Sequence, residues 1–138
     1  MKAIALLILF SFLVGCASYG DLNEKNGASV TGGFKDQALG KGLFFVEAAS
    51  GFAPWANSGG SRATFDRRAS ELCGGRKYTL LWIYEETGTP TGFRSQKSTT
   101  VVGYILAGDS PLTIEEAKRV VNAAREKAGL YPLTDWKK

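Results

Sequence analysis

The residue types that most often do chemistry in proteins are scarce in this sequence of 138 residues. It contains no histidine, so the commonest general base, a frequent metal ligand and the usual partner of a serine or cysteine nucleophile are missing. A zinc site needs three or four ligands, which Cys73 and scattered carboxylates do not supply. The sequence therefore predicts no catalytic residues, no metal site and no cofactor.

Two local patterns nevertheless have the residue types of a reactive site. Glu85 and Glu86 are adjacent in an expected strand, but successive strand side chains point to opposite faces, so they do not form a matched acid and base. Residues 57–61 (Asn-Ser-Gly-Gly-Ser) precede a helix and resemble an anion-binding turn, but they lack the spacing and the lysine of a P-loop. The enzymatic alternative is a cell-envelope hydrolase in which serine and lysine, or carboxylates, meet only in three dimensions.

The start of the chain is typical of an export signal. Lys2 is followed by an apolar run at residues 3–14, which is shorter than the roughly 20 residues of a membrane span. A positive start, a short apolar stretch and small residues near a cleavage point describe a secretory signal peptide. Ordinary secretion with cleavage after Ala17 is the alternative, and it would leave the position of Cys16 a coincidence.

Residues 13–16 (Leu-Val-Gly-Cys) resemble the lipobox of bacterial lipoproteins at all four positions. The resemblance implies removal of residues 1–15 as a signal peptide, a diacylglycerol group on the Cys16 thiol and acylation of its amine, for example by palmitate. Ala17 follows the cysteine in place of an aspartate. In enterobacterial lipoproteins this implies export to the outer membrane, here with the domain facing the periplasm.

Composition indicates one folded domain beyond that segment. Removing residues 1–15 leaves 123 of the 138 residues, which suits a single domain with its own core. The hydrophobic content of 44% and charged content of 22% are ordinary for a soluble domain. Residues 16–30 are polar and predict a flexible tether, and residues 31–138 the domain. Lysine and arginine are spread along the chain, so the net charge of +4 does not indicate nucleic-acid binding.

The periodicity of apolar residues predicts an α+β domain. Strands are expected near residues 30–37, 43–49, 78–85 and 98–107, with helices at 61–73 and 114–128. The order β-β-α-β-β-α favours a two-layer sandwich, in which a mainly antiparallel sheet of about four strands has both helices on one face. The alternative is a mixed sheet with a helix on each face. The nearly continuous apolar run at 78–85 favours a central strand, joined to 98–107 as an antiparallel hairpin.

The first helix has a recognisable start, end and buried face. Ser61 is the expected N-cap, and Gly74 with Gly75 the left-handed C-cap. Cys73 falls on the apolar stripe and is therefore expected in the core. Arg67 and Arg68 indicate a solvated face. The stripe consists of Phe65, Ala69, Leu72 and Cys73.

The second helix has stronger end signals. Thr113 and Glu116 form a T-x-x-E capping box, Gly129 is the expected left-handed residue after the helix, and Trp136 in the C-terminal tail folds back onto the domain. The expected buried face consists of Ile114, Ala117, Val121, Ala124 and Ala128.

Two loops contain the candidate binding residues. Phe52 and Trp55 lie in the loop after the second strand, and Phe93 and Arg94 lie in the loop between the third and fourth strands. Exposed aromatic and arginine residues are common anchors of interfaces, although Phe52 and Trp55 also suit a lid on the core edge.

These features predict a non-enzymatic binding or assembly-accessory module that is anchored to the membrane through the lipid on Cys16. The expected partner is an envelope protein or the cell wall. A structural subunit that self-associates through an exposed sheet edge is a third possibility.

A second resemblance concerns the domain. Residues 32–34 (Gly-Gly-Phe), followed by a strand, and residues 68–74 (Arg-Ala-Ser-Glu-Leu-Cys-Gly) are similar to segments of small outer-membrane lipoproteins of proteobacteria. The similarity covers about residues 32–85 and implies a shared fold.

Overall fold

The computed structural model describes residues 20–22, 32–50, 58–88 and 99–136. Within them the chain forms four strands and two helices, in the order that the sequence predicts. The elements are β1 (Gly32–Gly40), β2 (Leu43–Ser50), α2 (Ser58–Leu72), β3 (Tyr78–Thr87), β4 (Thr99–Ala107) and α3 (Ile114–Lys127).

The strands form one antiparallel sheet in the order β1-β2-β4-β3. This confirms the α+β class, the four-stranded antiparallel sheet and the hairpin between β3 and β4. Outside the strands, Asp21 forms an isolated bridge with Phe34, so the segment at residues 20–22 lies against part of the outer edge of β1.

The expected central position of β3 is wrong, because β2 and β4 occupy the centre and β3 is an edge strand. Its apolar run has another cause. The register shifts between Leu80 and Trp82, and this bulge changes which face the following side chains meet. Leu80 packs with the core on one face, whereas Leu81 and Trp82 pack with the core on the other. An edge strand can therefore be apolar on both faces without being central.

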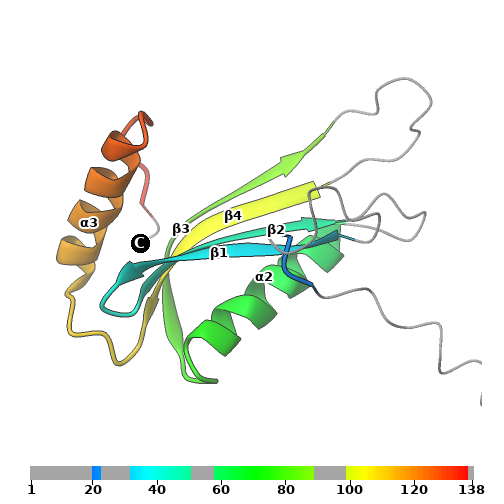
Figure 1. The fold of residues 1–138 in the computed structure, drawn as a ribbon, viewed down its shortest axis with the longest axis horizontal. Coiled ribbons are helices and arrows are strands. Elements are labelled where there is room, and N and C mark those ends of the chain that lie inside the picture. Colours follow the sequence, from blue (N-terminus) through cyan, green and yellow to red (C-terminus); the bar gives the residue numbers. More distant parts are fainter. Residues whose placement is uncertain (1–19, 23–31, 51–57, 89–98, 137–138) are drawn as a thin grey trace, which may run out of the picture.

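The two helices cover opposite faces of the sheet, so the expectation of both helices on one face is wrong. Side chains alternate along β4: Val101 and Ile105 pack with α2, and Tyr104 and Leu106 pack with α3. Figure 1 shows α2 beneath the sheet and α3 at the end where β1 turns into β2. The alternative is therefore right about a helix on each face, but wrong about a mixed sheet, because the sheet is antiparallel throughout.

Helix α2 begins at Ser58, three residues before the expected N-cap. Ser61 is instead buried inside the helix, where its hydroxyl donates to the Thr99 carbonyl oxygen at 2.8 Å. Phe65, one turn later, lies on Gly103: a Cβ there would come within 2.9 Å of the ring and 2.7 Å of the Trp82 carbonyl oxygen. A glycine in β4 thus lets α2 approach the sheet closely.

Both helices end as the glycines predict. Gly74 and Gly129 have φ angles of 63° and 73°, the left-handed region that glycine enters at low cost. The amides that follow bond back across the last turn, as in a Schellman motif: Gly75 donates to Ser70, and Leu130 donates to Arg125, both at 2.8 Å. The capping box of Thr113 and Glu116 is also confirmed.

The C-terminal tail folds back, as expected for Trp136. Leu133 and Trp136 pack against the core cluster shared by α3 and the sheet. The Asn122 side chain fixes the tail through both polar atoms of its amide group: its oxygen accepts from the Leu133 amide at 2.8 Å, and its nitrogen donates to the Leu133 carbonyl at 3.3 Å. Neither of the described helices is long and apolar enough to cross a membrane.

Candidate functional site

The residues that the sequence singles out for function lie outside the described residues. These are the lipidation site, Cys16, and the candidate partner-binding residues Phe52, Trp55, Phe93 and Arg94.

The described residues that flank the two binding loops lie together at one end of the sheet. Gly32 pairs with Ser50, and Thr87 pairs with Thr99. The Thr99 amide donates to the Ser50 hydroxyl at 2.8 Å. Both loops are therefore joined to the fold at the end of the sheet where β1 begins, at Gly32.

Several carboxylates and serines among the described residues have structural partners. Glu85 forms an ion pair with Arg62 at 3.1 Å, and Ser110 donates to the Lys41 carbonyl oxygen at 2.6 Å. Among the residues that the structure describes, no group of three or more cysteine, aspartate or glutamate side chains is arranged to hold a metal.

Cys73 is a core residue, as its place on the helix stripe predicts. It is 2% exposed and packs with Phe65 and Ala69. Burial raises the pKa of its thiol, because the thiolate would lose hydration, and Asp109 acts in the same direction. A thiol that is both buried and protonated is a poor nucleophile.

A polar network joins α2 to β3 on the face that α2 covers. Arg62 bonds both Asp66, at 3.2 Å, and Glu85. The Tyr78 hydroxyl donates to Asp66 Oδ1 at 3.1 Å. Burial, together with the neighbouring Asp66 charge, raises the pKa of Tyr78 to about 12. The Tyr78 hydroxyl therefore stays protonated and can donate to Asp66, and this bond helps to hold α2 on the sheet.

Arg68 does not belong to the solvated helix face that the sequence indicates. Its Nε donates to Asp36 Oδ1 in β1 at 2.7 Å, and its guanidinium lies 4.4 Å from the centre of the Phe34 ring. Arg67, one residue earlier, pairs at the surface with Glu71, four residues further along the helix. Sequence spacing can indicate such a local pair, but it does not reveal a pair between two elements.

Three aromatic side chains form a row across the face that α3 only partly covers. Phe45 and Tyr104 are register partners on β2 and β4, with ring centres 5.3 Å apart. Tyr104 and Trp82 are register partners on β4 and β3, 6.2 Å apart. Tyr84 continues this aromatic row beside Trp82 at 6.1 Å, nearly parallel to it and 51% exposed.

The aromatic row forms the floor of a groove of about 710 Å³ between the sheet and α3, which we call the inner groove. Its floor includes Phe45, Trp82 and Tyr104, and its wall is the C-terminal half of α3. The lining residues are Gln37, Ala38, Leu39, Phe45, Trp82, Val102, Tyr104, Ala124, Arg125, Lys127, Ala128 and Leu130.

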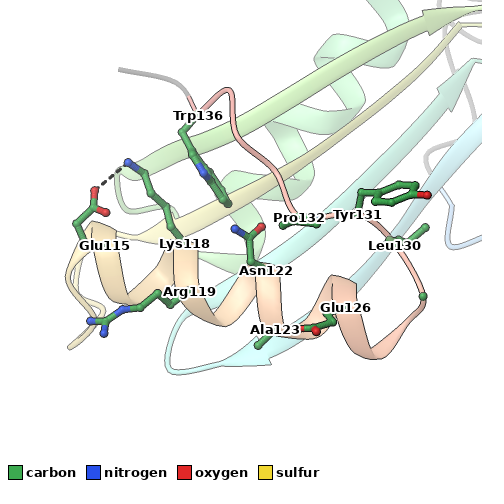
Figure 2. A pocket seen from close by; sticks show the side chains of 11 residues that line it. Glu115, Lys118, Arg119, Asn122, Ala123, Glu126, Leu130, Tyr131, Pro132 and Trp136 are labelled. Carbon is green, nitrogen blue, oxygen red and sulfur yellow. Dashed lines mark hydrogen bonds and ion pairs between the residues drawn. The ribbon is translucent and has the colours of Figure 1, made fainter.

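A second groove, the outer groove, lies on the opposite flank of α3, between the helix and the tail, and has a volume of about 870 Å³. Figure 2 shows Trp136 beside Lys118, whose ammonium pairs with Glu115 at 2.9 Å. Lys118 Nζ lies 5.8 Å from the Trp136 ring centre. One of the two cationic side chains in the lining of the outer groove, Lys118, is therefore already paired.

No pattern in the sequence identifies the inner groove as a site. The available signal was alternation, which places Trp82 and Tyr84 on one face of their strand. That signal does not give the register with β4 and β2, which brings Tyr104 and Phe45 into the same row. No protein-family model, curated protein or solved structure was found to match this chain.

Proposed function

We propose that this chain is a lipid-anchored protein of the bacterial cell envelope that acts as a non-enzymatic binding or assembly-accessory module. One observation carries the anchoring: the short apolar run ends at Cys16 in a sequence that resembles a lipobox. Its expected location is the outer membrane, with the domain facing the periplasm. The two or three acyl chains expected at Cys16 would make the attachment lasting, because one chain alone gives only marginal binding.

The described domain supports binding more than catalysis. The aromatic row lines the inner groove, and aromatic side chains are frequent anchors in binding sites. Ser61 bonds a backbone carbonyl and Glu85 bonds an arginine, so neither is positioned with a lysine or a second carboxylate. An envelope hydrolase using serine and lysine, or carboxylates, therefore has less support than a binding module.

Metabolic labelling with a palmitate analogue tests the anchoring. The wild type should incorporate the label and sediment with the outer-membrane fraction, whereas Cys16→Ser should do neither. Cys73→Ala is the matched control, because it removes the other cysteine of the chain and should leave the labelling unchanged. Labelling that persists in Cys16→Ser would contradict the proposal.

Site-specific photocrosslinking in the native envelope tests the binding role. A photoreactive residue at Tyr84, on the aromatic row, should capture a partner, and so should one at Phe93 or Trp55 if the loops bind. Tyr131, which is 89% exposed and lines the outer groove, is the control position. Crosslinks to nothing beyond the chain itself and its own acyl chains would overturn the binding role.

A self-associating structural subunit is the second candidate, and the edge position of β3 favours it. Unpaired edge strands are sites of strand addition. Glu85 and Glu86 lie on this strand and are exposed, and charged residues on an edge oppose such pairing. Sedimentation of the full chain carrying Cys16→Ser distinguishes the candidates, since a monomer would exclude self-association.

A further inference from the structure

The apolar stripe of α3 is only partly covered in the described domain. The stripe predicts five buried residues, but the structure buries only Ala117 and Val121 of them, and Ile114 is 47% exposed. Ala124 is partly exposed and Ala128 is exposed, and both line the inner groove. Below them the sheet presents the aromatic row. Two apolar surfaces thus face one another across an open space in the described domain.

The charged residues that line the inner groove are cationic, although Glu47, the register partner of the lining residue Val102, lies next to the lining. Of its twelve lining residues, Arg125 and Lys127 are cationic and none is acidic. The outer groove differs, because Glu115 and Glu126 balance Lys118 and Arg119 in its lining. Arg125 also donates from Nε to the Tyr131 carbonyl oxygen at 2.8 Å, which holds its guanidinium at the end of the helix. The inner groove therefore combines an apolar floor with a cationic rim.

We propose that the inner groove binds a single-chain anionic amphiphile, with its apolar chain on the aromatic row and its carboxylate or phosphate at Arg125 and Lys127. The volume of about 710 Å³ is in the range of small-molecule sites. A stable protein partner would bury about 800 Å² of surface on each side, which is a larger contact than one groove of this size offers. This inference rests on the proposed binding role. It does not rest on the anchor, because folded residues of the domain form the whole groove.

Calorimetric titration of the full chain carrying Cys16→Ser with dodecanoate, below its micelle concentration, tests the proposal. Removing the lipidated thiol leaves no acyl chain of the protein's own to compete. Saturable binding is expected, and shortening to decanoate and octanoate should weaken it about fourfold per methylene. Dodecyl maltoside, with a neutral head, should bind more weakly, and dodecyltrimethylammonium should bind least.

Adjacent alanines of α3 provide a matched pair of variants. Ala124→Trp fills the inner groove and should abolish dodecanoate binding, whereas Ala123→Trp lies at the outer groove and should retain it. Lys127→Gln should weaken dodecanoate about two- to fivefold without changing dodecyl maltoside. Lys77→Gln, on a lysine outside the groove, should change neither.

The proposal is overturned if no saturable binding occurs, if Ala123→Trp and Ala124→Trp behave alike, or if the cationic amphiphile binds as well as dodecanoate. Lys127→Gln keeps the test decisive if Ala124→Trp fails to fold, because a surface glutamine leaves the helix intact. Failure of binding together with normal palmitate labelling and crosslinking would reject this ligand class and leave the proposed function standing.

Discussion

Arg68 joins α2 to β1 through a hydrogen bond of 2.7 Å from its Nε to Asp36 Oδ1. The two side chains are only 25% and 17% exposed, so water screens the pair less than it screens an ion pair at the surface. The guanidinium also lies over Phe34, and a planar cation suits this position better than an ammonium.

We expect Arg68→Ala to lower the free energy of unfolding by about 1–3 kcal/mol, because it leaves a partly buried carboxylate without its partner. Arg68→Lys should lie between the alanine variant and the wild type. The control is Arg67→Ala, whose pair with Glu71 is at the surface and should cost less than about 1 kcal/mol. Urea unfolding measures all three, and equal losses at Arg67 and Arg68 would contradict this account.

Ser61→Ala should destabilise the domain by about 1–2 kcal/mol, because the buried carbonyl of Thr99 loses its hydroxyl donor. Ser70→Ala makes the same change at a less buried position of α2 and should be neutral or slightly stabilising, since alanine is the better helix former. If Ser61 were a dispensable helix-start residue, the two variants would have similar unfolding midpoints in urea.

Tyr78 should make stability fall at alkaline pH. Its folded pKa of about 12 exceeds the unfolded value of 10.0, so its contribution is complete below pH 10 and is lost as the pH rises toward 12. Tyr78→Phe should be less stable at neutral pH, because Asp66 loses a donor, and its stability should fall less over that interval. Tyr131→Phe, at an exposed side chain, should retain the wild-type profile, and ultraviolet titration of the phenols should detect the late proton loss.

The capping box should contribute to stability in a pH-dependent way. Hydrogen bonds from the Thr113 amide and hydroxyl lower the pKa of Glu116 below its ordinary 4.5. Its contribution is therefore present above pH 4.5 and is lost as the pH falls through the lowered folded value. Thr113→Ala should cost about 1 kcal/mol at neutral pH. Glu116→Gln should show a smaller loss of stability on acidification, and an unchanged acid profile would refute the assignment.

Cys73 should be almost unreactive toward thiol reagents in the folded chain carrying Cys16→Ser, because it is buried and its pKa is raised. Reaction with a chromogenic disulfide should become fast once urea unfolds the protein. The variant that also carries Cys73→Ala reports the background. Fast reaction of the native protein would mean that the end of α2 opens readily.

Local patterns predicted most of the elements, because caps and periodicity are properties of neighbouring residues. Thr113 and Glu116, Gly74 and Gly129, and the antiparallel order of the strands could all be read from the sequence. The face of the sheet that each helix covers could not be read from the sequence. The sheet order β1-β2-β4-β3 and the bulge near Leu81 decide which apolar side chains meet, and neither is a local property. Ser61 was misplaced because a serine three residues into a helix has the same local pattern as an N-cap.

The candidate site was harder to predict for the same reason. Its aromatic residues come from three strands, and only their register gathers them. The candidate residues of the two loops, Phe52, Trp55, Phe93 and Arg94, remain predictions. So does the lipid on Cys16.

The bridge between Asp21 and Phe34 has a consequence for access to the inner groove, because it brings the segment nearest Cys16 onto β1. The Phe34 amide donates to the Gly20 carbonyl oxygen at 3.0 Å. Gln37, the first groove residue along β1, lies three residues beyond Phe34, or about 10 Å at the rise of an extended strand. Gly20 is only the fourth residue after Cys16, so in a chain attached at Cys16 the groove would stay near the headgroups. Amphiphiles that leave this layer would then have a short path to it.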